Sequence, residues 1–200
     1  LFFGVVILFL LFYKLVFLRD PERNIPDGDN IVAPADGKVI KIINLKKVDW
    51  LKIKKGMVGK IKTLVPSNCK DGFLVTIMMD MFNVHVQRAP VKGVVVSTKH
   101  SSGTFRNAVY GAKFENGIMN EKNEIIIEDK KIGVVKVIQI AGLVARRIEC
   151  FVGKNQKINK GERIGRIVMG SQVCLILPNS VKLIVREGDS VKAGETILGE

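Results

Sequence analysis

Short runs of valine and isoleucine, separated by glycine-containing turns, recur along most of this chain of 200 residues. The turns come roughly every eight to twelve residues, and no long stretch shows the periodicity of a helix. β-Branched side chains fit the pleated, half-buried surface of a sheet. The sequence therefore predicts a mainly β domain, either a barrel or a sandwich. Its expected strands lie at residues 37–42, 73–79, 93–98, 124–127, 134–140, 148–152, 164–168, 173–177 and 181–185.

Two repeated patterns sharpen this prediction. Residues 33–39 and 89–95 share Ala-Pro-x-x-Gly-x-Val, and residues 158–164 and 191–197 share an aliphatic residue followed by x-x-Gly-Glu-x-Ile. Both pairs resemble the strand–turn units of the biotinyl/lipoyl-like barrel-sandwich hybrid fold, in which glycine serves tight turns between short strands. We therefore expect residues 31–200 to form one barrel-sandwich-hybrid-like domain.

The first eighteen residues form an apolar segment whose single charge is Lys14. About twenty apolar residues span a bilayer, so this segment predicts one marginal transmembrane helix, with a buried core helix as the alternative. It runs into Arg19-Asp20-Pro21 without a small-residue cleavage site, which favours a retained anchor over a signal peptide. The expected organisation is an anchor at 1–18, a linker at 19–30 and the domain at 31–200.

Charge suggests where the domain lies and what it meets. Lys14, Arg19 and Arg23 favour the cytoplasmic side of the cell membrane for the domain that follows a single-pass anchor. Because residues 1–30 carry a net charge of −1 and the whole chain +13, residues 31–200 carry +14. Such a domain is attracted to anionic lipid, so we expect a membrane lipid surface as a partner. Nucleic acid is not expected, because aromatic residues are sparse and no basic recognition helix is evident.

Cysteine and histidine usage limits the available chemistry. Cys69, Cys150 and Cys174 are odd in number and widely separated, which fits reduced thiols in a cytoplasmic domain rather than a disulfide framework. With only His85 and His100, no dedicated metal site is expected.

The pair Gly170-Ser171 interrupts two apolar runs that read as a buried strand pair. Most Gly-Ser pairs are turns in polar surroundings. At this junction the missing Cβ of Gly170 lets the Ser171 hydroxyl approach the Gly170 carbonyl, and the backbone can adopt the strained geometry of attack. The pair therefore suits a chain that cuts itself.

Self-cleavage needs a base and a group that orients the base. His85 lies just before an expected strand and is the best base candidate, although a lone histidine among valines is more often a hydrogen-bonded structural residue. His100 lies in a polar turn and is expected to be exposed. Asp36 could orient a histidine, but an aspartate before glycine is usually a turn former.

Several ordered blocks carry a more specific signal than any of them alone. They are Phe17-Leu18-Arg19-Asp20-Pro21-Glu22-Arg23, Ala33-Pro34-Ala35-Asp36-Gly37-Lys38-Val39, Phe82-Asn83-Val84-His85-Val86-Gln87-Arg88-Ala89-Pro90, Gly103-Thr104-Phe105-Arg106-Asn107-Ala108, Glu115-Asn116, Val144-Ala145-Arg146-Arg147-Ile148, and residues 161–171. Together, and nearly from end to end, the chain resembles the phosphatidylserine decarboxylase family in its short, single-domain form.

The resemblance implies that Ser171 is converted into a covalent pyruvoyl cofactor, with Asp36 and His85 as its triad partners. His85, held by Asp36, would remove the Ser171 proton, and the hydroxyl would attack the Gly170 carbonyl. Elimination would then leave a β chain of residues 1–170 and an α chain of residues 171–200, held together by paired strands. The pyruvoyl carbonyl would form a Schiff base with a serine headgroup and accept the electrons left as carbon dioxide departs. His85 would return a proton to the substrate.

The implied activity is therefore that of a carboxy-lyase proenzyme that converts a serine phospholipid into an ethanolamine phospholipid. The sequence leaves open whether the lipid is phosphatidylserine or archaetidylserine, and whether the chain forms a homo-oligomer. Some longer members carry a second histidine at the position of Phe82, so a role for two imidazoles is in doubt here. Candidates for binding the lipid phosphate, each with a surface or structural role as the alternative, are Arg88, Arg106, Arg146 and Arg147.

Two other classes of protein remain as alternatives. A non-enzymatic, membrane-anchored adaptor can also join an N-terminal anchor to barrel-sandwich repeats, but such adaptors usually insert a coiled coil and no heptad run is present. A biotin or lipoyl carrier needs a lysine displayed in a tight hairpin, and no convincing Met-Lys signature faces the repeated glycines.

Overall fold

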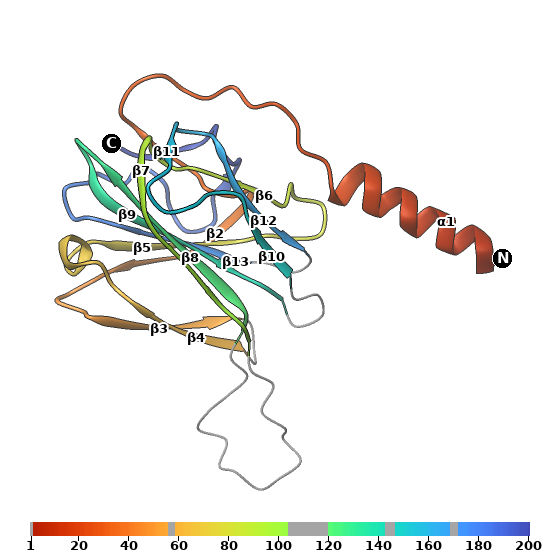
Figure 1. Ribbon diagram of the computed structural model, residues 1–200, viewed down its shortest axis with the longest axis horizontal. Helices are drawn as coiled ribbons and strands as arrows, with labels where there is room; N and C mark the ends of the chain where they lie inside the picture. The colour runs from red at the N-terminus through yellow and green to blue at the C-terminus, as the bar shows by residue number, and fades with distance from the viewer. Residues whose placement is uncertain (1, 56–58, 104–119, 143–146, 169–171) are drawn as a thin grey trace, which may run out of the picture.

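The computed structural model describes residues 2–55, 59–103, 120–142, 147–168 and 172–200. Strands make up the body, and the helix α1 (Phe2–Phe12) projects from one side of it (Figure 1). The prediction of a mainly β chain with an N-terminal helix is confirmed. Its finer assignment to the barrel-sandwich hybrid fold stays a prediction.

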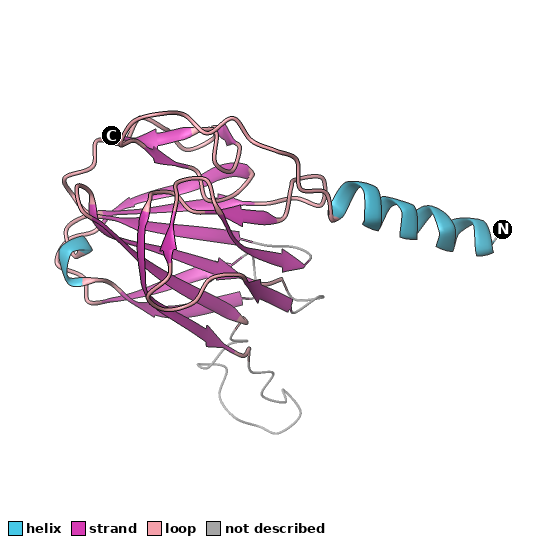
Figure 2. Cartoon of the chain, turned by 45° about the horizontal axis from the view of Figure 1, so that its top comes forward, coloured by secondary structure: helices cyan, strands magenta, loops and turns pink. Residues whose placement is uncertain are grey.

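The largest sheet of the described residues has eight antiparallel strands in the order β11-β7-β8-β9-β13-β5-β2-β14 (Figure 2). Their bounds are β2 (Gly37–Asn44), β5 (Phe73–Met78), β7 (Gly93–Ser101), β8 (Lys122–Asp129), β9 (Gly133–Ile140), β11 (Lys157–Ile158), β13 (Gln172–Leu177) and β14 (Ser190–Val191).

Smaller sheets and a 3-10 turn complete the described part of the body. One sheet has the order β10-β12-β6, and β1 pairs with β15 and β3 with β4. Their bounds are β1 (Ile31–Val32), β3 (Trp50–Lys55), β4 (Gly59–Leu64), β6 (Val86–Arg88), β10 (Arg147–Cys150), β12 (Arg163–Val168) and β15 (Ile197–Gly199), and the 3-10 turn is η2 (Ser67–Cys69).

Strand β13 is buried along its whole length because the sheet is covered on both faces. Val173 and Leu175 belong to the main core, together with Ile164 and Ile167 of the three-stranded sheet. Cys174 belongs to a second cluster, which contains residues of the β3–β4 hairpin. Alternate side chains of a strand point to opposite faces, so a strand buried on both faces reads as an unbroken apolar run.

The repeated Ala-Pro-x-x-Gly-x-Val patterns form two copies of one strand start. Gly37 begins β2 and Gly93 begins β7, with φ angles of 144° and 156°. A Cβ at either glycine would lie 2.2 Å from a backbone carbonyl oxygen of the neighbouring strand, that of Met78 or Glu128. Only glycine fits such an approach at these φ angles, which explains why both patterns contain one at this position.

The other repeated pattern pairs with the first. Val191 of β14 lies opposite Gly37, and Ile158 of β11 lies opposite Gly93. The glycines three residues further on, Gly194 and Gly161, have φ angles of 77° and 79°. The two sequence repeats are therefore two structural copies, which we call the Asp36 copy and the Lys92 copy after the residue before each strand-starting glycine.

The N-terminal segment is helical over most of the expected anchor. After α1, a π-helical stretch, η1 (Tyr13–Phe17), brings the chain to the body of the molecule. No helix in the described part of the chain is both long and apolar enough to cross a bilayer. The predicted transmembrane span is therefore not supported, since the eleven residues of α1 rise only about 16 Å against roughly 30 Å of hydrocarbon.

Candidate active site

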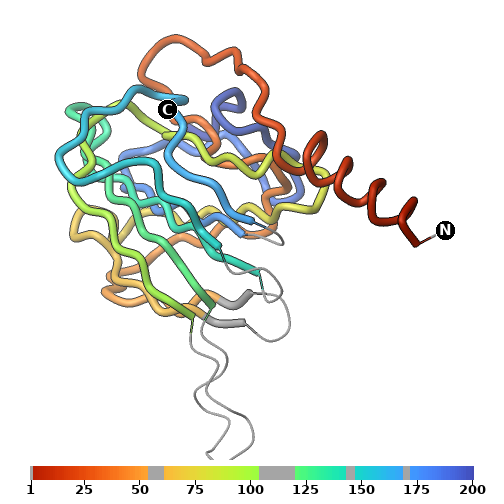
Figure 3. Tube along the Cα trace, turned by 45° about the vertical axis from the view of Figure 1, so that its right-hand side comes forward, coloured from red at the N-terminus to blue at the C-terminus, as the bar shows by residue number. Residues whose placement is uncertain are grey.

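One end of the large sheet lies next to Asp36 and leads into the loop that carries His85. Cα partners run across it from β2 to β7 as Lys38↔Met78, Met78↔Gln172, Gln172↔Ile140, Ile140↔Lys122 and Lys122↔Ser101. Asp36 precedes β2 at this end, and His85 follows β5 by a short loop. The tube in Figure 3 shows β5 running into that loop beside the base of α1.

The predicted cleavage site, Gly170 and Ser171, lies outside the described residues. The residues on either side are described: Val168 ends β12, and Gln172 begins β13. Gln172 belongs to the row of partners at the Asp36 end of the sheet. The Ile167 backbone N–H, one residue before Val168, donates a hydrogen bond of 3.1 Å to the His85 carbonyl. One described flank of the junction thus lies near the candidate base, and the other lies at the end of the sheet that Asp36 precedes.

His85 is completely buried, and its two ring nitrogens have different surroundings. Nδ1 lies 2.9 Å from the Asn83 carbonyl oxygen, which can only accept a hydrogen bond. Nδ1 therefore carries the proton in the neutral ring, and Nε2 carries the lone pair. Nε2 is buried without a partner among the described residues. A buried, unpaired acceptor of this kind is what a base needs before its substrate hydroxyl arrives.

The electrostatic setting keeps His85 neutral. Burial lowers the pKa of His85 most strongly, and the charge of Arg19 lowers it further. The hydrogen bond to Asn83 and the charges of Asp80 and Asp36 oppose this shift, but the pKa stays below its ordinary value of 6.5. At neutral pH the ring is therefore unprotonated and able to take a proton.

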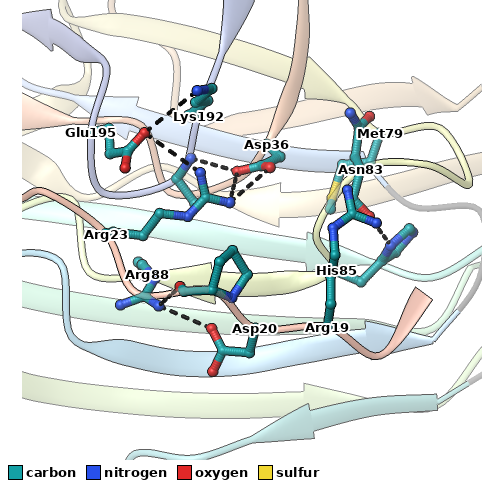
Figure 4. Close-up of polar contacts among 12 residues, drawn as sticks. Arg19, Asp20, Arg23, Asp36, Met79, Asn83, His85, Arg88, Lys192 and Glu195 are labelled. Carbon is teal, nitrogen blue, oxygen red and sulfur yellow. Dashed lines mark hydrogen bonds and ion pairs between the residues drawn. The ribbon is translucent and has the colours of Figure 1, made fainter. Parts of the chain in front are cut away.

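Asp36 is held by Arg23 rather than by His85 (Figure 4). Arg23 Nη2 lies 3.0 Å from Asp36 Oδ1 and 2.9 Å from Oδ2, and both side chains are largely buried. The Ala193 backbone N–H donates a further hydrogen bond of 2.8 Å to Oδ1. The direct contact expected between Asp36 and His85 is not among the described hydrogen bonds, and the Asn83 carbonyl holds the ring instead. Asp36 acts on His85 as a nearby charge.

The linker and the end of η1 bring further groups to this site. The Phe17 ring packs on the His85 ring with a centroid distance of 4.0 Å. Arg19 donates to the Val16 and Phe82 carbonyls, and its side chain lies beside the His85 loop (Figure 4). The end of the expected anchor therefore supplies Phe17 to His85, and the expected linker supplies Arg23 to Asp36.

The four arginine candidates fall into different settings. Arg88 is buried, and its guanidinium donates to Asp20, Pro21 and Gly161, which satisfies a structural role. Arg147 is exposed and lies opposite Val168 in the β10–β12 pair, at the end of the strand that leads to residue 170. Arg106 and Arg146 lie outside the described residues. Binding of the lipid phosphate by any of them stays a prediction.

Comparison with known proteins decides the family. The phosphatidylserine decarboxylase family model matches residues 10–199 of this chain. The chain belongs to the phosphatidylserine decarboxylase family. It is 41% identical over 195 residues to the phosphatidylserine decarboxylase proenzyme of Chlorobaculum tepidum, an alignment that covers 96% of this chain and 79% of the relative. It is 37% identical over 202 residues to the putative archaetidylserine decarboxylase proenzyme of Methanocaldococcus jannaschii, covering 98% of this chain and 94% of the relative.

Within this phosphatidylserine decarboxylase fold, sequence reasoning missed two of the groups around the candidate residues. No contact with Asp36 or His85 was expected for Arg23 or Phe17, because these contacts depend on how the N-terminal segment returns to the body. A cation thirteen residues before a buried aspartate was the available signal for Arg23. No cluster of three or more acidic, histidine or cysteine side chains suited to a metal is present in the described ranges.

Proposed function

We propose that this chain is a self-processing decarboxylase that converts a serine phospholipid into the corresponding ethanolamine phospholipid. The observation that carries the proposal is the buried, unpaired Nε2 of His85, at the end of the sheet where the chain enters and leaves the Gly170-Ser171 junction. Membership of a family whose relatives are named decarboxylase proenzymes favours this enzyme over the adaptor and carrier alternatives.

Self-processing begins at the Ser171 hydroxyl. Its proton moves to His85 Nε2 while Oγ bonds to the Gly170 carbonyl carbon, and the Gly170–Ser171 peptide bond then breaks as its nitrogen takes up a proton. Loss of the Ser171 α-proton expels Gly170 as a carboxylate. Water replaces the remaining nitrogen, which leaves as ammonia, and a pyruvoyl group stays at residue 171. A neutral, buried imidazole suits the first of these transfers.

A pyruvoyl group at residue 171 would supply a carbonyl able to condense with the substrate amine and to accept the electron pair released with carbon dioxide. The residues of the chain provide the rest of the site. His85 Nε2 would take a proton from the substrate ammonium group and return it to the substrate α-carbon, and the charge of Asp36 favours the ring while it is protonated. Phe17 covers one face of the ring and limits the access of water to it.

The arrangement of the chain also supports attachment to a membrane. Every residue of α1 is apolar, and none is buried against the body. We propose that α1 inserts into a lipid bilayer and keeps the catalytic domain on its cytoplasmic side. Both phosphatidylserine and archaetidylserine present the same headgroup, and relatives named for each lipid match this chain.

The activity is tested by incubating the purified protein with phosphatidylserine or archaetidylserine vesicles and measuring the ethanolamine lipid by mass spectrometry. We expect conversion of at least one lipid and its loss after treatment with hydroxylamine, which blocks a reactive carbonyl. Matched samples with His85→Gln and with His100→Gln should be inactive and active respectively, because His100 is half-exposed on β7. Conversion that survives both hydroxylamine and His85→Gln contradicts the proposal.

A further inference from the structure

The loop between β5 and His85 carries two exposed apolar side chains. Met81 is 59% exposed and Phe82 is 62% exposed. The loop is not loosely held: Asp80 Oδ1 accepts hydrogen bonds from the Phe82 and Asn83 backbone N–H groups at 2.8 and 3.1 Å. Asn83 Oδ1 in turn accepts one from the Asp80 backbone N–H at 2.8 Å. The fold therefore fixes this turn with its two apolar side chains pointing away from the core.

This loop is continuous with the N-terminal helix. The Phe82 ring contacts the Phe12 ring edge-on, with a centroid distance of 5.9 Å. Arg19 fastens the two elements together, since it donates to Val16 of η1 and to Phe82 of the loop. Met81, Phe82 and α1 thus form one exposed apolar surface, which we call the docking surface.

The chemistry of the docking surface indicates its partner. A groove in a second protein would cover one face of a helix, and the opposite face would then be polar. The large side chains of α1 from Phe2 to Leu11 are all exposed, so the helix is apolar on every side. An environment that is apolar on all sides is the interior of a bilayer. Lys14 and Arg19 follow at the base of the helix, a position that suits charges at the level of lipid headgroups.

We propose that Met81 and Phe82 are a second point of membrane insertion, which holds the His85 end of the sheet against the bilayer surface. Phe82 is three residues before His85, and Phe17 joins the helix to the His85 ring. Two attachment points fix the orientation of the body, whereas α1 alone leaves it free to turn. A headgroup can then reach the site from the bilayer while its tails remain in the lipid. This inference rests on the proposed function for its substrate.

The test uses fluorescence of the full chain. Its one tryptophan, Trp50, lies on β3 in the hairpin, on the opposite side of the body from α1 in both Figure 1 and Figure 3. The wild-type chain therefore serves as the control, and Trp50→Phe/Phe82→Trp moves the probe to the docking surface. On vesicles of phosphatidylcholine with phosphatidylglycerol, we expect a blue shift and quenching by brominated acyl chains at position 82 but not at position 50.

A second measurement uses variants without the introduced tryptophan, so that its result does not depend on any change that this residue causes. Met81→Ser/Phe82→Ser should lower vesicle binding in flotation by about tenfold, as expected from loss of two inserted apolar side chains. The matched control, Trp50→Ser/Leu64→Ser, removes two similarly exposed apolar side chains from the hairpin and should change binding by less than about twofold.

Three outcomes overturn the inference. They are water-exposed emission from position 82 while the protein floats with vesicles, equal loss of binding in the two double variants, and a blue shift that appears without vesicles and grows with protein concentration. The last would mean that a second copy of the chain covers the surface. Self-cleavage is read on the same samples by gel, so docking without cleavage would contradict the proposed function and leave this inference standing.

Discussion

The two structural copies share a backbone and differ in charge at the residue before the strand-starting glycine. In one, Asp36 is buried and bonded to Arg23 and to the Ala193 backbone N–H. In the other, the side chain of Lys92 is 59% exposed and pairs with Asp29 at the surface. Since a lysine serves the same turn, the turn itself does not require an aspartate. The burial and pairing of Asp36 therefore call for another explanation, and its closeness to His85 supplies one.

The surroundings of the two copies also differ in burial and in charge. At the position equivalent to Ala193, the Lys92 copy has Lys160, whose Nζ binds the Gly28 carbonyl and the Asn30 side chain. These lysines and Asp29 line a pocket of about 100 Å³. One copy has thus kept a buried carboxylate beside a buried base, while the other has a solvated cluster of charges. This difference supports the proposal that the chemistry belongs to the Asp36 copy.

The largest contrast is expected between charge removal in the two copies. Asp36→Asn should slow self-cleavage by roughly 100-fold, because it removes the nearer of the two carboxylates that pair with buried Arg23, leaving Glu195 at 3.6 Å, and removes a charge that favours protonated His85. Lys92→Gln should change the rate by less than about twofold, as for a surface pair. The rate of fragment appearance after synthesis measures both, and equal rates in the two variants would remove Asp36 from the mechanism.

Replacing the strand-starting glycine with alanine should destabilise the protein to a similar extent in both copies. Gly37→Ala and Gly93→Ala each place a Cβ 2.2 Å from a carbonyl oxygen at a positive φ, so each should cost about 2–4 kcal/mol of the free energy of unfolding. Urea denaturation in the uncut Ser171→Ala background measures this. Gly153→Ala is the control, because its Cβ would meet nothing within 4 Å. A loss at only one of the two glycines would contradict their equivalence.

Arg23 provides a further test of the comparison, because in the Asp36 copy this buried cation binds the residue before the strand-starting glycine. Arg23→Gln should slow self-cleavage by about tenfold, because Asp36 keeps the Ala193 hydrogen bond but loses its counter-ion. Arg163→Gln, which removes a more exposed arginine bonded to Asp20 and Glu22 of the same linker, should have little effect. If both variants cleave themselves equally slowly, self-cleavage depends on the linker in general, and Arg23 has no specific role.

The smallest expected effect is a difference in pH dependence. The folded pKa of His85 lies below 6.5, so the unfolded chain binds a proton there more readily. The stability contributed by neutral His85 is therefore present above pH 6.5 and is lost as pH falls through the folded pKa. In the Lys92 copy, Lys131 and Lys92 lower the pKa of exposed Asp29 from 3.8 to about 2, so its contribution disappears only below about pH 4.

Thermal unfolding of the uncut chain between pH 7 and pH 5 separates the two copies. His85→Gln should flatten the fall in stability over this range, and Lys92→Gln should leave it unchanged. An unchanged slope in His85→Gln would mean that His85 does not titrate as a buried neutral group.

Local sequence predicted the two repeats and most strands of the large sheet, for a physical reason, but it missed the β3–β4 hairpin and predicted a strand at 181–185 that the structure does not form. Turns that need glycine and runs of β-branched residues are set by neighbours along the chain, as Gly37 and Gly93 show. It predicted the contacts of the site less well. The Arg23–Asp36 pair, the Phe17–His85 contact and the Asn83 carbonyl on His85 depend on how a linker and a loop return to the body. The pattern of a single sequence carries little information about which distant segments pack against each other.

The central claim is that this chain cuts itself at Gly170-Ser171, and intact mass tests it most directly. The purified wild-type chain and Ser171→Ala are compared under identical conditions. We predict two wild-type fragments that divide between residues 170 and 171, the smaller with a pyruvoyl N-terminus, and a single uncut chain for Ser171→Ala. A single uncut wild-type chain, or the same cut in Ser171→Ala, would contradict the account.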